Sequence, residues 1–313
     1  MKCLVTGAAG FIGSNLSKKL LSLGYDVTGI DSFSDYYPRK IKEANIAGLL
    51  KHKKFSFVEG DLNGIDIKKL ASGASVIFHK AAQPGVRKSW GSDFSIYIRD
   101  NIRATQRLLE NVKDMPLDKL IYASSSSVYG DIRSLPMKEA SPTRPVSPYG
   151  VTKLAAEHLC YLYHKNFGLP FAALRYFTVY GPGQRPDMAF HMFLKHIILN
   201  EEIIIFGDGK QTRDYTFISD VVQANIRAMD KNAEGGIYNI GGHARITVLD
   251  VLDMLRDITG KKIKVKFIEK QKGDMKHTYS DITRAKKYLK YSPDYSVKEG
   301  LKEEYKWLRS ILK

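Results

Sequence analysis

A glycine-rich stretch, Gly7-Ala8-Ala9-Gly10-Phe11-Ile12-Gly13, follows the short apolar run Lys2–Thr6 and opens a segment of helical period, Phe11–Leu23. Glycines at these three places allow a tight turn, a close approach of the backbone to a pyrophosphate, and close packing of helix against sheet. The N-terminus of the helix then faces the phosphates. After a strand and before a helix, the pattern predicts a dinucleotide-binding turn.

Short apolar runs alternate with helical segments through the first half of the chain. These runs are typical of buried strands. They are Lys2–Thr6, Asp26–Ile30, Phe55–Glu59, Val76–His79, Lys119–Ala123 and Phe171–Arg175. The helices expected between them are Phe11–Leu23, Phe94–Val112 and Tyr149–Phe167. This alternation predicts an α/β fold of the Rossmann type, a doubly wound parallel sheet with right-handed crossovers.

The pattern changes after Tyr176, where glycine-rich turns interrupt it. A helix at Ile218–Met229 and a strand at Gly236–Ile240 are expected to return to the first domain. We therefore predict an NAD-binding domain of residues 1–176, joined by 215–242, and a smaller α/β substrate-binding lobe of residues 177–214 and 243–313.

The composition describes a globular protein. The chain has 313 residues, 43% of them hydrophobic, which is enough for a sizeable core. Cys3 and Cys160 are too few for a disulfide framework or a thiolate zinc site, so we expect a cytoplasmic protein without a metal. No run approaches the roughly 20 apolar residues of a membrane span, and glycines break the apolar stretch that resembles a signal peptide.

The formal charge of +16 is the one unusual bulk property. Such a surface attracts polyanions. The lysines lie in short scattered clusters outside any recognisable nucleic-acid module, so no nucleic-acid partner is expected. A positive field would also favour the approach of a diphosphate substrate. A non-catalytic NAD-binding protein with a basic RNA-binding face remains the alternative from another functional class.

Asp31 ends the second predicted strand, about 20 residues after the glycines. Its carboxylate can accept hydrogen bonds from ribose hydroxyls and would repel a 2′-phosphate, which predicts NAD rather than NADP. Asp61 and Leu62, after the third strand, are candidates for the adenine end of the cofactor.

Tyr149 and Lys153 form a Y-x-x-x-K pair on a predicted helix, about one turn apart on one face. A neighbouring ammonium and the positive nicotinamide of NAD⁺ would lower the pKa of the tyrosine from its usual value of about 10 and make it a base. The run Ser124–Gly130 follows the fifth strand, at the sheet edge where such folds bind ligands. A serine there can hold the reacting oxygen or relay its proton.

With these residues the chain resembles the extended short-chain dehydrogenases/reductases, specifically nucleotide-sugar epimerases, over essentially its whole length. The matching motifs are Gly7–Gly13, His79-Lys80-Ala81-Ala82, Ser124–Gly130, Tyr149–Lys153, Arg175-Tyr176-Phe177 and Gln211-Thr212-Arg213-Asp214. The resemblance implies Ser125 as the catalytic serine, Tyr149 as base and Lys153 as a bridge to the nicotinamide ribose.

The resemblance also implies further binding residues. For NAD these are Lys80, Ala81 and Ala82 beside the pyrophosphate, Asn101 near the ribose, and Tyr176 on the nicotinamide side. For the UDP-sugar they are Gln83, Arg87, Ser126, Ser127, Thr178, Arg185, Asp274, Thr278 and, at the phosphates, Arg213.

Two positions depart from the family pattern. The family usually carries an apolar residue at the place of Lys80, and it often carries an arginine shortly before Gly273-Asp274, where this chain has Gln271 and Lys272. Lys272 is the candidate to replace that diphosphate-binding arginine.

The implied reaction is inversion of C4 of a UDP-hexose through a 4-keto sugar that turns over and is reduced on its other face. Family dehydratases carry an Asp-Glu pair where this chain has Ser126 and Ser127, which disfavours dehydration. A one-way nucleotide-sugar reductase remains an alternative, and would consume NADH stoichiometrically.

The sugar is left open between two candidates. Arg185, facing C6, would suit the carboxylate of UDP-glucuronate, although it could instead pair with Asp187. Thr278 occupies a gate position that is bulky in epimerases restricted to UDP-glucose, so UDP-N-acetylglucosamine also fits. The resemblance further implies a homodimer formed through the helices Phe94–Val112 and Tyr149–Phe167.

Overall fold

A computed structural model describes residues 1–132, 134–270 and 273–312. Lys272, the candidate for the second diphosphate contact, and its neighbour Gln271 lie outside the described residues. Within the described ranges, no helix is both long and apolar enough to cross a membrane, and no group of three or more potential metal-ligating side chains occurs.

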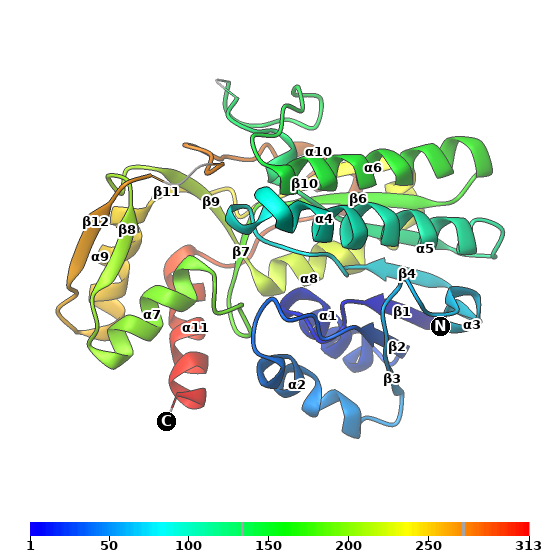
Figure 1. Cartoon of the computed structure of the whole chain (residues 1–313), viewed down its shortest axis with the longest axis horizontal. Coiled ribbons are helices and arrows are strands. Elements are labelled where there is room, and N and C mark those ends of the chain that lie inside the picture. Colours follow the sequence, from blue (N-terminus) through cyan, green and yellow to red (C-terminus); the bar gives the residue numbers. More distant parts are fainter. Residues whose placement is uncertain (133, 271–272, 313) are drawn as a thin grey trace.

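The large sheet confirms the Rossmann-type prediction (Figure 1). Its seven strands run in the order β10-β6-β5-β4-β1-β2-β3, and every neighbouring pair is parallel. The strands are β1 (Lys2–Thr6), β2 (Asp26–Asp31), β3 (Phe55–Glu59), β4 (Val76–His79), β5 (Lys119–Ser125), β6 (Phe171–Tyr176) and β10 (Gly236–Ile240).

Helices cover both faces of this sheet because successive strand residues point to opposite sides. In β1, Cys3 and Val5 join one core and Leu4 joins the other. The first core includes residues of α1 (Phe11–Ser22) and α8 (Ile218–Arg227); α2 (Arg39–Ala47) lies next to α1 (Figure 1). The second includes residues of α3 (Ile67–Ala71), α5 (Ala104–Val112) and α6 (Pro148–Phe167).

The single helix predicted at Phe94–Val112 is continuous but irregular. It begins as α4 (Phe94–Tyr97), passes through a π-helical segment at Ile98–Arg103, and continues as α5. π-helical turns inside α-helices are often found at functional sites. This one carries Asn101, whose carbonyl accepts a hydrogen bond from Thr105 at 2.6 Å.

The remaining elements form two smaller sheets with their own helices (left of Figure 1). One sheet has the order β11-β9-β7 and the other pairs β12 with β8 in parallel. The elements are β7 (Thr178–Tyr180), α7 (Ala189–Leu199), β8 (Ile203–Phe206), β9 (Thr212–Phe217), β11 (Arg245–Thr247), α9 (Val248–Thr259), β12 (Val265–Ile268) and α11 (Val297–Ile311). β10 pairs with β6 at the edge of the large sheet, where α10 (Thr283–Leu289) packs beside it. The domain boundaries themselves stay a prediction.

Candidate active site

One cleft of about 650 Å³ runs along the carboxyl ends of the central strands and on toward the smaller sheets. It brings together all but one of the residues predicted for the site. Those lining it are Gly7, Gly10, Phe11, Ile12, Gly13, Asp31, Asp61, Leu62, Lys80, Ala81, Ala82, Gln83, Arg87, Ser125, Ser126, Ser127, Tyr149, Lys153, Tyr176, Thr178, Arg185, Arg213, Asp274 and Thr278.

The glycine turn after β1 packs so closely against neighbouring backbone that a side chain would not fit at two of its glycines. Gly7 has a φ of +69°, and a Cβ there would lie 2.8 Å from the backbone nitrogen of Ala81. A Cβ on Gly13 would lie 2.0 Å from the carbonyl oxygen of Gly7. No side chain caps α1 and no acid stands in its first turn, so its N-terminal amides suit a pyrophosphate. The turn therefore fits the pyrophosphate of a dinucleotide.

Alanine at Gly13 should lower the affinity for NAD by at least about tenfold, because the added methyl group would force the turn apart. Titration calorimetry with NAD⁺ measures the change. Gly48→Ala is the matched control, since Gly48 has a φ of −70° and nothing near its Cβ position. Equal NAD affinity in both variants would contradict this account of the turn.

Asp31 stands at the end of β2 with its carboxylate fixed by two backbone amides. Its Oδ2 accepts from Ala9 N at 3.0 Å, and its Oδ1 accepts from Phe33 N at 2.9 Å. Lys42, which sequence reasoning missed, lines the same end of the cleft and donates to the Ser34 carbonyl at 2.8 Å. Asp61 and Leu62 lie beside this end, and the Asp61 carboxylate accepts from Asn63 N at 2.8 Å.

The catalytic candidates come from β5 and the first two turns of α6. The Ser147 hydroxyl accepts a hydrogen bond from Gly150 N at 3.1 Å and so caps the N-terminus of α6. This cap fixes the first helical turn, which carries Tyr149. The ring of Tyr97 meets that of Tyr149 edge to face, with centroids 6.3 Å apart. Lys153, one turn further, is buried with its amine 4.5 Å from the centre of the Tyr122 ring. Ser125 ends β5 opposite Tyr176 of β6.

The sequence analysis expected a lowered pKa for Tyr149, whereas in this structure the pKa of Tyr149 is raised. Burial raises the pKa of Tyr149, and a hydrogen bond with Ser125 and the charge of Arg185 only partly oppose this rise. Burial also lowers the pKa of Lys153 to about 7, so its amine is a weaker cation than an exposed lysine. Without a bound ligand, the protein therefore does not favour the phenolate form of Tyr149.

Because the pKa of Lys153 is lowered in the folded state, the buried amine should reduce the folding stability of the NAD-free protein by an amount that depends on pH. Between pH 7 and about 10.4 an unfolded chain protonates this amine more fully than the folded chain, so the unfolding free energy rises with pH. Lys153→Met should therefore stabilise the protein by about 2–4 kcal/mol more at pH 7 than at pH 10. Urea unfolding at the two pH values checks this, with Lys18→Met as the exposed control. A pH-independent effect of Lys153→Met would contradict it.

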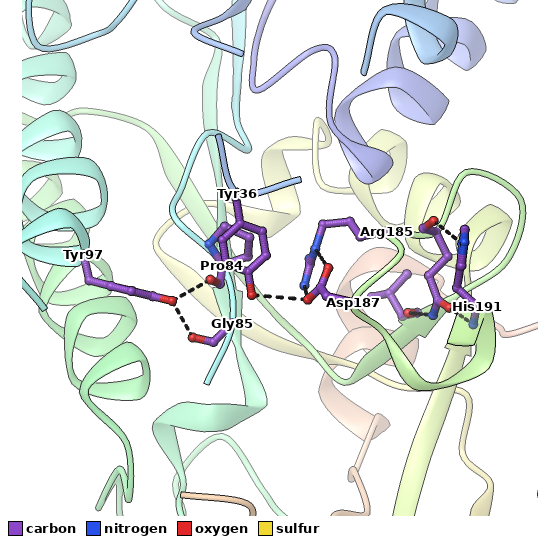
Figure 2. Close-up of polar contacts among 9 residues, drawn as sticks. Tyr36, Pro84, Gly85, Tyr97, Arg185, Asp187 and His191 are labelled. Carbon is purple, nitrogen blue, oxygen red and sulfur yellow. Dashed lines mark hydrogen bonds and ion pairs between the residues drawn. The ribbon is translucent and has the colours of Figure 1, made fainter. Parts of the chain in front are cut away.

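Arg185 reaches the cleft but already has a partner (Figure 2). Its guanidinium holds Asp187 through two hydrogen bonds of 2.9 and 3.0 Å, and the Tyr36 hydroxyl donates to the same carboxylate at 3.3 Å. Burial acts to raise the pKa of Asp187, but the charge and hydrogen bonds of Arg185, together with hydrogen bonds from the Asp187 backbone and Tyr36, bring the pKa below its ordinary value. A substrate carboxylate would have to share Arg185 with Asp187.

Other predicted substrate residues meet across the cleft. Arg87, from the large sheet's side, pairs with Asp274 at 2.7 Å and lies over the Phe206 ring. Arg213 donates to the carbonyl of Thr212 at 3.0 Å. The hydroxyl of Thr278 accepts from Asp214 N at 3.2 Å, so the small gate residue is held in place by backbone.

One expected cofactor contact, that of Asn101, needs correction, and the direction of the Lys80 side chain differs from that of its backbone. Asn101 does not line the cleft; its side chain is buried, accepts from Gln83 N at 2.7 Å and donates to Thr152 at 2.9 Å. It therefore holds the wall of the cleft in place. The Lys80 backbone lies next to Gly7, but its side chain turns away from the glycine turn toward β5 and β6.

Sequence reasoning missed several aromatic residues of the wall. Tyr36 lines the cleft and reaches Asp187, whereas Tyr97 lies behind the wall and donates to the carbonyls of Pro84 and Gly85 at 2.8 and 2.9 Å (Figure 2). Their partners are 12 to 151 residues away in the chain. Only a folded structure reveals such pairs.

Known proteins share this architecture. The model of the NAD dependent epimerase/dehydratase family matches residues 3–241. The uncharacterized UDP-glucose epimerase YtcB of Bacillus subtilis (strain 168) is 45% identical over 99% of both chains. The UDP-glucuronate 4-epimerase of Thermodesulfobacterium geofontis (strain OPF15) is 39% identical over 97% of this chain and 95% of its own. A crystal structure of UDP-glucuronic acid 4-epimerase from Bacillus cereus, in complex with UDP-glucuronic acid and NAD, has a TM-score of 0.97 and 46% identity, covering 99% of this chain and 100% of that one.

Proposed function

The chain belongs to the NAD dependent epimerase/dehydratase family, and from that premise we propose that it inverts C4 of UDP-glucuronate. It is an NAD-dependent UDP-sugar 4-epimerase; the identity of the sugar and the roles of single residues are our proposal. The observation that carries it is a cleft with Arg185 and three hydroxyls, those of Ser126, Ser127 and Thr178, in a chain of 46% identity and TM-score 0.97 to a UDP-glucuronic acid complex.

In this proposal, different residues of the chain transfer the proton and position the reactants. Tyr149 takes the proton of the 4-hydroxyl and later returns it, and Ser125 holds the reacting oxygen. Lys153 stands one helical turn away, where it can bind the nicotinamide ribose. NAD, when bound, supplies the hydride acceptor and donor.

Recognition of the sugar rests on further residues that line the cleft. The hydroxyls of Ser126, Ser127 and Thr178 can donate to a C6 carboxylate, and Arg185 adds a charge that Asp187 shares. Arg213 faces the cleft for the diphosphate; burial lowers its pKa, and pairing with an anion would offset that penalty.

A substrate panel tests the proposal. The protein is incubated with UDP-glucuronate, UDP-N-acetylglucosamine or UDP-glucose, and the C4 epimers are followed by proton NMR. We expect UDP-glucuronate to give the highest kcat/KM by at least about tenfold, since the sugar-facing polar groups suit a carboxylate. A higher kcat/KM for UDP-N-acetylglucosamine would overturn the choice of sugar. Stoichiometric consumption of NADH would instead indicate a reductase.

We also propose that two copies pair through α4 to α6. Apolar side chains remain exposed on these helices, and Val151 and Leu162, three turns apart on α6, are 46% and 49% exposed. Light scattering should give twice the 35.3 kDa mass of the chain, and Leu162→Glu should give the monomer. A monomeric wild type would contradict the proposal.

A further inference from the structure

The carboxylate of Asp187 is held from two sides in the wall of the cleft (Figure 2). The guanidinium of Arg185 donates to its two oxygens at 2.9 and 3.0 Å. The hydroxyl of Tyr36 donates to one of these oxygens at 3.3 Å. Tyr36 is itself fixed, because its hydroxyl packs on the backbone of Gly85, where an added Cβ would lie 2.0 Å from the hydroxyl oxygen. The carboxylate therefore has a defined place beside the guanidinium.

The loop that carries this ion pair is anchored at both ends. The side chain of Gln184 donates to the Val179 carbonyl of β7 at 3.0 Å and accepts from His191 N of α7 at 2.9 Å. His191 Nδ1 lies 3.0 Å from the Gln184 carbonyl oxygen. Met188 N donates to the Arg185 carbonyl at 3.1 Å and closes the turn. The guanidinium and its carboxylate partner thus leave a short turn that is tied to β7 and α7.

Asp187 is the counter-ion of Arg185 in the ligand-free protein. It is the only carboxylate within ion-pair distance of Arg185 in the part of the chain that the structure describes, and the two side chains are 32% and 20% exposed. Arg185 lies close enough to Tyr149 for its charge to act on the phenol, whose pKa it lowers against the effect of burial. The proposed function places C4 of the sugar at Tyr149, and C6 is attached to the carbon next to C4. A C6 carboxylate would therefore approach both members of the ion pair.

We propose that Asp187 is a specificity-determining residue, a resident counter-ion of Arg185 that strengthens binding of neutral UDP-hexoses and weakens binding of UDP-glucuronate. This inference rests on the proposed function, because that function brings the C6 carboxylate to Arg185. The ligand's carboxylate is repelled by that of Asp187 while the two share one guanidinium. A neutral sugar brings no anion, and Asp187 then prevents the covered guanidinium from being left as an unpaired charge.

The test compares the dissociation constants of UDP-glucuronate and UDP-glucose, measured by titration calorimetry with NAD⁺ present. All variants are made in Tyr149→Phe, so that neither sugar is converted during the titration. Asp187→Asn removes the charge, while its amide oxygen can still accept from Arg185 and Tyr36. Asp187→Glu keeps the charge. Asp35→Asn is the matched control, because Asp35 is an exposed carboxylate next to Tyr36 that does not line the cleft.

We expect the ratio Kd(UDP-glucose)/Kd(UDP-glucuronate) to rise about tenfold in Asp187→Asn, and to stay within about twofold of the Tyr149→Phe parent in Asp187→Glu and Asp35→Asn. A purely structural role of Asp187 would weaken the binding of both sugars alike. An unchanged or lower ratio in Asp187→Asn would therefore overturn the inference, as would an equal rise in Asp35→Asn. Failure of the wild type to epimerise UDP-glucuronate would count against the proposed function instead, since the binding ratio does not depend on turnover.

Discussion

Tyr149→Phe is expected to lower kcat for UDP-glucuronate by about 10³- to 10⁴-fold while binding of the UDP-sugar changes little. The phenol oxygen is the group proposed to exchange a proton with the 4-hydroxyl, and phenylalanine keeps the ring that packs edge to face on Tyr97. The loss should therefore fall on kcat and leave the dissociation constant of the substrate within a few-fold of the wild type. Proton NMR of the C4 epimers gives the rate, and calorimetry gives the binding.

Tyr288→Phe is the control for loss of a tyrosine hydroxyl, because Tyr288 is exposed on α10 and does not line the cleft. Its kcat should match that of the wild type. If Tyr149→Phe retained more than about a tenth of the wild-type kcat, Tyr149 would not be the base.

Glu157→Gln is expected to lower the free energy of unfolding by about 3–5 kcal/mol. Glu157 and Arg175 are 1% and 3% exposed, and the carboxylate is the only charged partner of Arg175 among the described residues. The amide cannot neutralise the guanidinium, which would be left as an unpaired buried charge. The same carboxylate accepts from Ser124, next to Ser125, so catalysis should suffer too.

Urea unfolding measures this loss. Glu43→Gln is the matched control, because the Arg39–Glu43 pair has side chains about half exposed and should contribute less than about 1 kcal/mol. Equal losses of unfolding free energy in the two variants would contradict the expectation that the buried Glu157–Arg175 pair matters more for stability than an exposed pair.

The large sheet could be predicted from sequence because its signals are local. Each buried strand is a short apolar run, and the glycine turn after β1 identifies the strand that the cofactor approaches. The parallel pair β8–β12 was not predicted: Ile204 and Phe267 are exposed, and Lys266 interrupts the apolar run of β12.

The cleft was harder to predict where contacts join distant residues. Arg87 meets Asp274 across 187 positions, and Tyr36 meets Asp187 across 151. The pairing of Arg185 with Asp187, two residues away, was foreseen as an alternative and is what the structure has. The direction of the Lys80 side chain and the raised pKa of Tyr149 depend on burial, which a single sequence does not reveal.

The most direct test of the proposed chemistry follows a deuterium atom placed at C4 of UDP-glucuronate. Oxidation and re-reduction of the same carbon within one closed cleft predict that the epimerised product keeps the label when the reaction runs in ordinary water, and that the labelled substrate turns over more slowly. Mass spectrometry and NMR of the product read the label directly. Product in which solvent hydrogen has replaced the deuterium would contradict the account.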